Sequence, residues 1–585
     1  MFDIINILGF NSPEWLIANN GCQLAGCIAA GIYATNIPDA CHYITEHSKA
    51  NVVVLEDNKQ LIKYRGCKIA TLKHVVTYAE APDAQLVAAF KAEGVSVYYW
   101  PDFLALGANI STEDVTARSD ALKPGNCSTL IYTSGTTGPP KAVMISHDNI
   151  TWTTRNLATF YPPFDHEDRI ISYLPLSHIA AQVIDVHVPL RCGACTYFCQ
   201  PDALKGTLTV TLKEVFPTIF FGVPRVWEKI QEKMMQLGSE TTGLKKHIAT
   251  WAKGLGKEKN KRAQFGAEGG TPFGFGCANA IVLKKVKDAL GLTEVKACFT
   301  AAAPLSPEVI WYFSQLDIQV YEVFGQSECT GPHTCSYGYE WKVGTCGRPM
   351  YGTVSKLAEG TGELCYAGRH IFMGYMYMEE QTKETIDSEG FLHSGDVAEF
   401  DADVKSKKNG ALEDFVGESG FMKITGRIKE LLITAGGENI PPVLIETNIK
   451  NEMAAVSNCI VVGDKRKYLC MLVSLKCKMD PATGAPIDDL DTPALSVGKT
   501  IGSEVTTLTA AASCPKWAAY IDAGMKTANK GNASSAQHVQ KWKMLPVDLS
   551  EKEGDLTPTL KLKRSVVVKK YTSILDEMYG EVLTF

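Results

Sequence analysis

The chain has 585 residues, of which 45% are hydrophobic and 21% are charged, with a net charge of −6 and a mean hydropathy near zero. A chain of this length exceeds a single hydrophobic core and is expected to divide into at least two domains. The acidic balance argues against a general nucleic-acid-binding protein, which would carry a basic excess. The opening residues MFDIINILGF include an acid and no basic segment, so a secretory signal peptide is not predicted there.

The most apolar stretch near the start is GCQLAGCIAAGIYAT, residues 21–35. It is too short and too rich in small residues to span a bilayer. We predict a buried helix over these residues.

Short β-branched runs then alternate with amphipathic stretches. We predict strands over residues 52–57, 128–134, 169–175, 218–223, 297–303 and 319–325, and helices over 224–237 and 276–292. Such alternation is typical of an α/β fold, with largely parallel sheets flanked by helices. Ligands in these folds lie beyond the carboxyl ends of the strands.

The chain holds eighteen scattered cysteines, which are expected to be reduced thiols in the absence of a secretory signal. The one cluster is RCGACTYFC, in which Cys192 and Cys195 have C-x-x-C spacing and Cys199 follows. Zinc and redox sites use this spacing, but no second pair nearby completes a tetrahedral set. We therefore favour a half-buried apolar strand.

A polar, charged stretch without periodicity, DADVKSKKNGALEDFVGESG, occupies residues 401–420 and is predicted to be a surface loop or linker. A second unit follows, with compact strands predicted over 458–464 and 469–477. We place the boundary near residue 427, which gives an N-terminal domain of residues 1–426 and a C-terminal domain of residues 427–585.

Residues 132–147, YTSGTTGPPKAVMISH, combine hydroxyls, glycines and a lysine, as a phosphate-binding loop requires. The candidate residues are Thr133, Ser134, Gly135, Thr136, Thr137, Gly138, Pro139, Pro140 and Lys141. The stretch is not a P-loop, because the two prolines disfavour a helix that starts on the lysine and Ala142 replaces the magnesium-binding hydroxyl.

Four later stretches carry further candidate residues, each with an ordinary structural alternative such as a solvated acid, a turn cap or an exposed basic face. They are YEVFGQSECTG (321–331) with Phe324, Gly325, Ser327 and Glu328; FLHSGDVAEF (391–400) with Asp396; GRIKE (426–430) with Arg427; and TPTLKLKRSVV (557–567) with Lys561, Lys563 and Arg564.

In this order, the five stretches resemble the adenylate-forming superfamily of acyl-CoA synthetases, luciferases and peptide-synthetase adenylation domains, over nearly the whole chain. Other stretches are similar to the long-chain fatty acyl-CoA synthetases, and the tail QHVQKWKMLPVDLS to their bubblegum-type branch. The former are ILGFNSPEW (7–15), QPDALKGTL (200–208), FFGVPRVWEKI (220–230), TAAAP (300–304), HIFMGYM (370–376) and LTPTLKLKR (556–564).

The resemblance implies an ATP-dependent long-chain fatty acid–CoA ligase. Such an enzyme converts a fatty acid and ATP to acyl-AMP and pyrophosphate, and then transfers the acyl group to CoA. It implies a large α/β domain of sheets flanked by helices and a small mobile α+β domain that carries a catalytic lysine. ATP, Mg²⁺ and CoA are the expected cofactor and co-substrates, and catalysis is expected to rest on positioning and charge neutralisation.

The resemblance also implies roles for the large-domain residues. The loop 133–141 would hold the β- and γ-phosphates, Glu328 would bring Mg²⁺, and Ser327 would hydrogen-bond near the α-phosphate or the carboxylate. Phe324, followed by Gly325, would stack on adenine, with Ala302 and Ala303 of TAAAP on the other side of the base.

Asp396 would accept hydrogen bonds from the ribose hydroxyls, and Arg427 would contact ribose or phosphate. Lys561 is expected to close over the reacting groups, an alignment that Arg564 supports over Lys563. His178, in YLPLSHI, would lie near the acyl carboxylate, with a core histidine as the alternative.

Three residues are expected to serve the second step. Lys429 matches the hinge about which the C-terminal domain rotates, and Gly436 and Gly437 would face the pantetheine of CoA. Trp227 is a weak candidate for the acyl pocket, since an aromatic residue at a strand end is as often plain core.

The chain departs from the family pattern in two places. Family members carry a further segment before ILGFNSPEW, which is either dispensable here or lost by truncation. The 401–420 stretch is longer than the usual turn, and we favour a tolerated loop over one that slows domain rotation.

Two other readings compete with the ligase. One is a fatty acyl-AMP ligase that serves a carrier protein, or a luciferase-like oxygenase; the other is a catalytically silent lipid-binding homologue. The expected partners are the substrates, with no nucleic acid. The expected location is the cytoplasm, with peripheral contact to an internal membrane.

Overall fold

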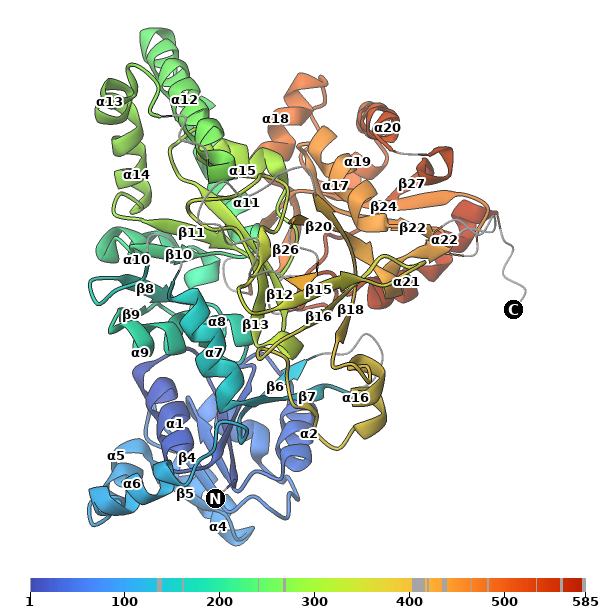
Figure 1. Cartoon of the computed structure of the whole chain (residues 1–585). Helices are drawn as coiled ribbons and strands as arrows, with labels where there is room; N and C mark the ends of the chain where they lie inside the picture. The colour runs from blue at the N-terminus through green and yellow to red at the C-terminus, as the bar shows by residue number, and fades with distance from the viewer. Residues whose placement is uncertain are drawn as a thin grey trace.

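The computed structural model describes residues 2–133, 139–159, 163–239, 241–266, 270–401, 416–417, 420–433, 439–464, 466–480, 483–532, 534–557 and 561–580. Figure 1 shows two large sheets with helices packed around them and the C-terminal segments to one side. This arrangement confirms the predicted α/β class.

The first sheet has eight strands, and its neighbours are parallel except where β7 pairs with β6 and β17. Its order is β17 (Gly374–Tyr375), β7 (Lys141–Ser146), β6 (Cys127–Thr133), β2 (Ile28–Ile32), β1 (Ile4–Leu8), β3 (Val52–Leu55), β4 (His74–Thr77) and β5 (Ser96–Tyr99). Its central strands are continuous runs of apolar residues because both faces are covered.

The second sheet has seven strands, of which β8 to β12 pair in parallel and β13 and β14 add antiparallel edges. Its order is β14 (Arg348–Pro349), β13 (Gly331–Cys335), β12 (Val320–Gln326), β11 (Ala297–Thr300), β10 (Ile219–Phe221), β8 (Arg169–Ser172) and β9 (Cys195–Phe198). The six strands predicted for the N-terminal domain are confirmed as β3, β6, β8, β10, β11 and β12.

A third, five-stranded sheet was not predicted. It is mostly antiparallel, in the order β19 (Val416–Gly417), β15 (Val354–Leu357), β16 (Glu363–Ala367), β18 (Leu392–Asp401) and β20 (Phe421–Arg427). Its alternating burial fits a sheet with one covered face, and β20 brings the chain to the predicted domain boundary.

Separate hydrophobic clusters form from Leu432 onward. The main one surrounds the sheet of β23 (Val456–Val462), β24 (Leu469–Leu475) and β27 (Val539–Met544), so both strands predicted for this region are confirmed. Two small pairs complete it: β21 (Leu432–Ile433) with β22 (Asn439–Ile440), and β25 (Cys477–Met479) with β26 (Pro486–Leu490).

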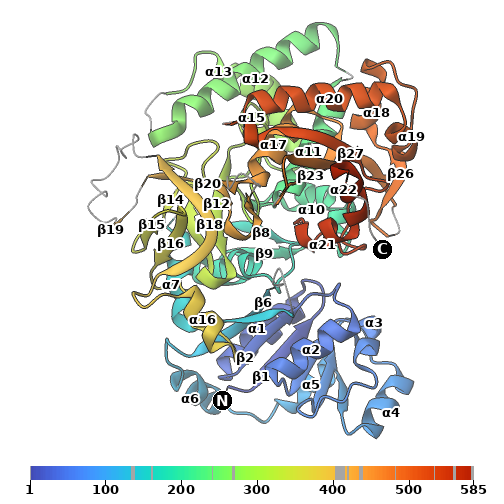
Figure 2. The ribbon, with the colours of Figure 1, turned by 90° about the vertical axis from the view of Figure 1, so that its right-hand side faces the viewer.

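The helices flank these sheets (Figures 1 and 2). In chain order they are α1 (Pro13–Leu24), α2 (Pro38–Ser48), α3 (Asn58–Leu61), α4 (Ala84–Ala92), α5 (Trp100–Leu106), α6 (Thr112–Asp120), α7 (His147–Leu157), α8 (Ile179–Ala181), α9 (Val188–Cys192), α10 (Leu208–Val215), α11 (Pro224–Ser239), α12 (Gly243–Ala263), α13 (Phe275–Ala278), α14 (Lys284–Leu290), α15 (Pro307–Ser314), α16 (Glu379–Thr385), α17 (Pro442–Glu452), α18 (Thr492–Thr500), α19 (Leu508–Ala512), α20 (Pro515–Lys530), α21 (Arg564–Lys570) and α22 (Thr572–Tyr579).

The helix predicted over 224–237 is confirmed as α11. The helix predicted over 276–292 is α13 and α14 joined by a π-helical turn, η5 (Asn279–Leu283). Among the described residues, none of the helices is both long and apolar enough to cross a bilayer.

The buried helix predicted over residues 21–35 is wrong. Helix α1 ends at Leu24, the chain reverses at Gly26 with φ +75°, and β2 (Ile28–Ile32) enters the sheet between β1 and β6. A fully buried parallel strand and a buried helix have the same apolar signature over a few residues. Gly26 was the signal that separates them, because glycine readily adopts positive φ.

The strand favoured for the cysteine cluster is confirmed only for its second part, as β9, whose residues alternate between exposed and half-buried; Cys192 instead ends helix α9. Cys195 is exposed, Cys199 is buried, and both are free thiols. The 401–420 loop falls largely outside the described residues.

Candidate functional site

The predicted phosphate loop connects two antiparallel strands. Thr133 ends β6 and pairs with Lys141, the first residue of β7. The lysine therefore begins a strand, as expected from the prolines before it, and Pro140 accepts a hydrogen bond from the Tyr43 hydroxyl at 3.2 Å. Ser134, Gly135, Thr136, Thr137 and Gly138 lie outside the described residues, while Pro139 precedes β7 within them.

The hairpin between β12 and β13 positions Ser327 and Glu328. At Gly325 the two strands approach so closely that a Cβ would lie 1.7 Å from the carbonyl oxygen of Gly331, so the position admits only glycine. Ser327 is buried, and Thr330 takes a left-handed conformation with φ +57°. The tight turn thus holds Glu328 at the end of β12.

Tyr375, which is not among the predicted site residues, links Glu328 to Lys141 of the predicted phosphate loop. Its hydroxyl donates a 2.7 Å hydrogen bond to Glu328 Oε1, and Lys141 Nζ lies 4.6 Å from the centre of its ring. Burial raises its pKa, so the hydroxyl stays protonated and remains a donor. Its place in HIFMGYM, a stretch noted only for resemblance, was the available signal.

The chain passes to the TAAAP stretch directly after β11, and Phe324 lies near the end of the neighbouring β12. Ala302 has φ +78°, an unusual conformation for a residue with a Cβ. Ala303 is exposed, and Phe324 is half-buried. The structure thus brings Ala302, Ala303 and Phe324 to one edge of the seven-stranded sheet, where strained backbone often marks a functional site.

Asp396 and Arg427 are cross-strand partners on β18 and β20. Arg427 Nε donates to Asp396 Oδ1 at 2.8 Å. Burial raises the pKa of Asp396 while the guanidinium opposes that shift, and the carboxylate in turn raises the pKa of Arg427. The structure therefore joins the two predicted ribose residues in one ion pair.

Lys561 comes from the far end of the chain and lies among these charges. Burial lowers its pKa to about 8, with repulsion from Arg427 acting in the same direction and Asp396, Glu328 and Glu430 opposing it. Its backbone carbonyl accepts a hydrogen bond from the Thr557 N–H at 2.8 Å, and its backbone N–H donates to Thr557 Oγ1 at 3.0 Å. Residues more than 130 positions apart in the sequence thus meet at one place.

Arg564, three residues later, has a different task. It forms a bidentate pair with Glu446 of α17, with both nitrogen–oxygen distances at 2.7 Å. Such a pair fixes the segment that presents Lys561 against the core of the C-terminal region.

His178 lies close enough to Lys561 for the two charges to interact. Burial, followed by Lys561, lowers the pKa of His178 to about 4, so the imidazole is neutral at pH 7. Its Nδ1 accepts a 3.2 Å hydrogen bond from the Ala180 N–H at the start of α8. The core alternative does not account for its nearness to Lys561.

Trp227 is fully buried and belongs to the main hydrophobic core. Its indole N–H donates to the carbonyls of Gly222 and Phe299, at 3.1 and 3.2 Å. Its ring packs edge-on against Phe220 and Phe313. These contacts describe a core residue, and a role in the acyl pocket stays a prediction.

Helix α11, which contains Trp227, contacts the C-terminal region through its charged face. Glu232 Oε1 lies 2.5 Å from Lys476 Nζ, and both side chains are largely buried. The helix that begins in the stretch quoted for an acyl pocket therefore also forms an ion pair with the C-terminal region.

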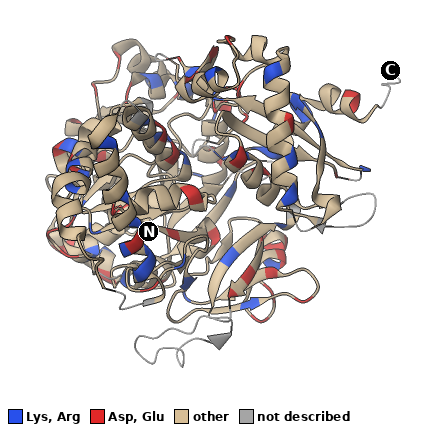
Figure 3. Ribbon diagram, turned by 90° about the horizontal axis from the view of Figure 1, so that it is seen from above, with Lys and Arg blue, Asp and Glu red and all other residues tan. Residues whose placement is uncertain are grey.

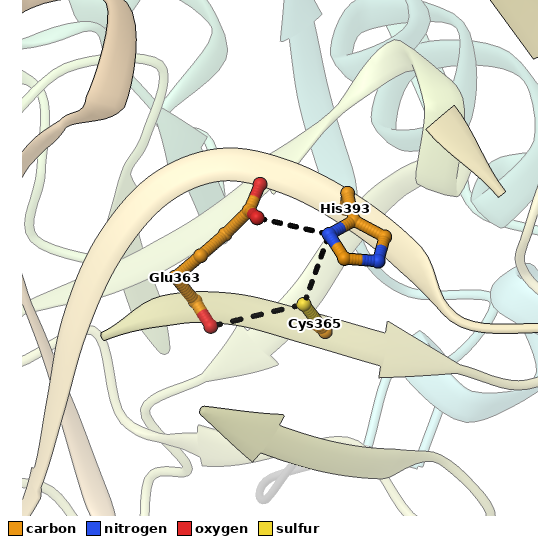
Figure 4. Close-up of side chains that lie close together, drawn as sticks. All are labelled: Glu363, Cys365 and His393. Carbon is orange, nitrogen blue, oxygen red and sulfur yellow. Dashed lines mark hydrogen bonds and ion pairs between the residues drawn. The ribbon is translucent and has the colours of Figure 1, made fainter. Parts of the chain in front are cut away.

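A carboxylate outside the predicted set supports the turn before Asp396 (Figure 4). Glu363 Oε1 accepts a hydrogen bond from the Gly395 N–H at 2.8 Å, and Oε2 lies 2.9 Å from His393 Nδ1. The other ring nitrogen of His393 faces Asp387 at 3.5 Å. His393 stands three residues before Asp396 in FLHSGDVAEF, which was the sequence signal for this support.

Glu363, Cys365 and His393 also bring three metal-ligating atoms within 4.8 Å of one another. Both carboxylate oxygens of Glu363 already have partners, however, and the cysteine thiol contacts His393 Nδ1 at 3.5 Å. Burial raises the pKa of this thiol to about 11, which disfavours the thiolate that a metal needs. Hydrogen bonding accounts for the cluster.

The predicted second-step residues are only partly described. Lys429 lies in the 3₁₀ turn η8 (Ile428–Glu430) directly after β20. Gly436 and Gly437 lie outside the described residues.

Two family models match the chain. Residues 3–376 match the AMP-binding enzyme family, and residues 429–490 match the AMP-binding enzyme C-terminal domain. Asp396, Arg427 and Lys561 lie outside the two matched segments.

Relatives match along almost the whole chain. The long-chain-fatty-acid–CoA ligase ACSBG2 of Gallus gallus is 44% identical over 100% of this chain and 75% of its own length. The ACSBG2 of Homo sapiens is 40% identical over 99% and 85%, and the ACSBG1 of Mus musculus is 41% identical over 99% and 78%.

Solved structures share the fold at low sequence identity. The A domain of a carboxylic acid reductase from Segniliparus rugosus, in complex with AMP and a co-purified carboxylic acid, has a TM-score of 0.66 at 20% identity, covering 99% of this chain and 83% of that one. The anthranilate CoA ligase AuaEII, in complex with anthranoyl-AMP, has a TM-score of 0.65 at 17% identity, covering 98% and 88%.

Proposed function

The chain belongs to the AMP-binding enzyme family and, within it, to the bubblegum-type long-chain fatty acid–CoA ligases, and we propose that the site built around Lys561 carries out its first reaction step. In that step a fatty-acid carboxylate attacks the α-phosphate of ATP, forming acyl-AMP and releasing pyrophosphate. In the second step the thiol of CoA attacks the acyl carbon and AMP leaves.

The observation that carries this proposal is the position of Lys561. It lies among Glu328, Asp396, Arg427 and His178, in a region where burial strengthens every charge interaction. Negative charge gathers on the carboxylate and the α-phosphate as they react, so a lysine cation there stabilises the transition state more than the separated substrates.

The remaining residues would bind and orient the nucleotide. Asp396 and Arg427 would hold the ribose, and Phe324 with Gly325, Ala302 and Ala303 would enclose the adenine. Ser327 would contact the α-phosphate or the fatty-acid carboxylate. His178 would lie beside that carboxylate in its neutral form, so it would add no charge. Lys141, with the loop from Thr133, would meet the β- and γ-phosphates.

Glu328 would hold Mg²⁺. A carboxylate is the hard oxygen ligand that this ion prefers, and Tyr375 fixes one of its oxygens at 2.7 Å. The ion would supply charge neutralisation for the phosphates.

We further propose that the division into mobile domains falls at residues 426 and 427, with Lys429 at the hinge. Rotation there would remove Lys561 and bring Gly436 and Gly437 toward CoA. The separate hydrophobic clusters on the two sides of this point support the boundary.

We place the enzyme in the cytoplasm with peripheral contact to an internal membrane, because long-chain fatty acids and their CoA esters partition into bilayers. The enzyme's preference for the chain length and saturation of its fatty acid would depend on the depth of the acyl pocket.

The test is formation of palmitoyl-CoA from palmitate, ATP, Mg²⁺ and CoA, followed by mass spectrometry. Lys561→Ala is expected to lower acyl-AMP formation roughly a hundredfold or more, while added palmitoyl-AMP still yields thioester. Lys563→Ala, two residues on, is the matched control and should leave both steps intact.

Two outcomes would contradict this function. Acyl-AMP without thioester would favour a fatty acyl-AMP ligase that serves another acceptor. No adenylate from a folded sample, across several chain lengths, would favour a silent lipid-binding homologue.

A further inference from the structure

Helices α12, α13 and α14, with η5 between them, form a projection that stands at one end of the molecule (Figures 1 and 2). We call it the α12 projection, residues 243–266 and 270–290. It has a small hydrophobic cluster of its own: Ala252, Phe275, Ala278 and Leu283. One side of α12 is fixed to the body of the domain, since a Cβ on Gly256 would lie 2.3 Å from the Gln315 carbonyl oxygen. The opposite side faces outward.

Large apolar side chains of the projection are exposed. Leu244 and Trp251, seven residues apart and therefore on one face of α12, are 75% and 45% exposed. Phe273 is fully exposed, and its neighbour Gly274 lies beside Trp251, because a Cβ there would be 3.6 Å from Trp251 Cζ2. Ile281 of η5 is 52% exposed. Leaving these large apolar side chains exposed to water costs free energy, and soluble proteins normally avoid it by burying them.

The same projection is strongly basic. Helix α12 contains seven Lys and Arg residues and one acid, Glu258, a balance of +6 in a chain whose net charge is −6. Figure 3 looks down on this end of the molecule with the basic residues in blue. Some of the charge is used internally: Lys259 and Lys287 both pair with Asp317, and Arg262 pairs with Glu258.

Five further cations of the projection are exposed: Lys245, Lys246 and Lys261 of α12 and Lys284 and Lys285 of α14. Exposed lysines together with exposed Trp, Phe and Leu side chains are typical of segments that lie in the headgroup region of a bilayer.

We propose that the α12 projection is the surface by which this enzyme docks on membranes that contain anionic lipids. The inference rests on the proposed function, because a ligase for long-chain fatty acids takes its substrate from, and returns its product to, a lipid phase. The apolar side chains enter the acyl boundary and the lysines meet the headgroups. An acidic protein would satisfy the lysines but leaves Phe273 and Leu244 without a hydrophobic environment.

The experiment is flotation of the full chain with vesicles of phosphatidylcholine alone or mixed with phosphatidylserine. We expect binding to the mixed vesicles and release at high salt, because screening weakens the lysine contribution. The variant Lys245→Gln/Lys246→Gln/Lys261→Gln is expected to lower the vesicle partition coefficient roughly a hundredfold, and Phe273→Ser about tenfold.

The matched control is Ile37→Ser, which removes a side chain that is 66% exposed next to α2, at the opposite end of the molecule in Figure 1. It occupies a helix N-cap, where serine is favoured, so folding is preserved. Equal loss of vesicle binding in this variant and in Phe273→Ser would overturn the proposal. Failure of the wild-type protein to bind the mixed vesicles would also overturn it.

Ligase activity on detergent-dispersed palmitate separates this inference from the proposed function. Phe273→Ser is expected to keep wild-type activity in detergent and to lose rate only when palmitate is supplied in mixed vesicles. Activity in detergent without vesicle binding by the wild type overturns the docking surface alone. Absence of activity in both formats overturns the function.

Discussion

The predicted nucleotide-binding residues lie on or beside the strands of three sheets, whereas Lys561 comes from near the end of the chain. Asp396 and Arg427 are joined across β18 and β20, and Gly325 lies in a hairpin with no room for a Cβ. Lys561 forms two hydrogen bonds with Thr557, and the segment after it is held by the pairing of Arg564 with Glu446. Under the proposed function, the residues that bind the nucleotide would be fixed to the sheets, and the lysine that leaves between steps would be fixed to the C-terminal region.

The strongest test of the fixed side is Gly325→Ala. Its Cβ would collide with the Gly331 carbonyl, so we expect a loss of about 3 kcal/mol in the free energy of unfolding and a fall in adenylation of roughly a hundredfold. Chemical denaturation and pyrophosphate release measure the two effects.

Gly21→Ala is the control for this substitution, because that position in α1 is open and has no neighbour within 4 Å. It should raise stability by roughly 0.5–1 kcal/mol. If Gly325→Ala matched Gly21→Ala in stability and adenylation rate, the strands β12 and β13 could separate enough to accommodate a Cβ at residue 325.

The movable side should respond to pH through Lys561. Its pKa of about 8 lies below the ordinary lysine value, so the cation is present below pH 8 and is lost as pH rises through it. The charged fraction falls from about one half at pH 8 to about one hundredth at pH 10, so acyl-AMP formation is expected to fall roughly fiftyfold over this range in stopped-flow assays at subsaturating ATP. Lys561→Arg stays charged throughout and should flatten that decline, although at a lower rate. If the rate of Lys561→Arg declined above pH 8 as steeply as that of the wild type, the decline would belong to another titrating group.

Glu363→Gln tests the support beneath Asp396. The amide keeps the acceptor for Gly395 but loses the one for His393, so the KM for ATP should rise about fivefold with little change in kcat. Glu359→Gln, at an exposed position four residues earlier, should leave both constants unchanged. A fall in kcat alone would place Glu363 in the chemistry instead of in nucleotide positioning.

The smallest expected effect belongs to the ion pair between the two bodies. Lys476→Ala removes the partner of Glu232, which should slow acyl-AMP formation about threefold and leave thioester formation from added palmitoyl-AMP intact. Lys478→Ala, whose partner Asp489 lies within the same region, is the control. Equal slowing of both half-reactions would indicate a general loss of stability.

The sequence predicted the parallel part of the fold well, because each buried strand is an apolar run that ends in a turn. It did not predict the five-stranded sheet, since β18 contains the pair Ser394–Gly395, which is typical of a turn, and β15 and β16 are only four and five residues long. The apolar run 21–35 predicts a helix, and only Gly26, with its positive φ, marks the reversal that separates the end of α1 from β2. The family motifs predict that Lys561, Asp396 and Glu328 lie close together, and in the structure Lys561 interacts electrostatically with both carboxylates. Tyr375 and Glu363 act through contacts with distant strands, which no local pattern displays.

The position of Arg427 has a thermodynamic consequence. It is the last residue of β20 and the partner of Asp396, and η8 with Lys429 follows at once. Under the proposed function, a nucleotide bound at this arginine would hold one end of the hinge. Linkage would make the influence reciprocal, so the angle of the C-terminal domain would alter nucleotide affinity by the same factor. ATP and AMP, which differ in phosphate charge, would accordingly report domain angle through their dissociation constants.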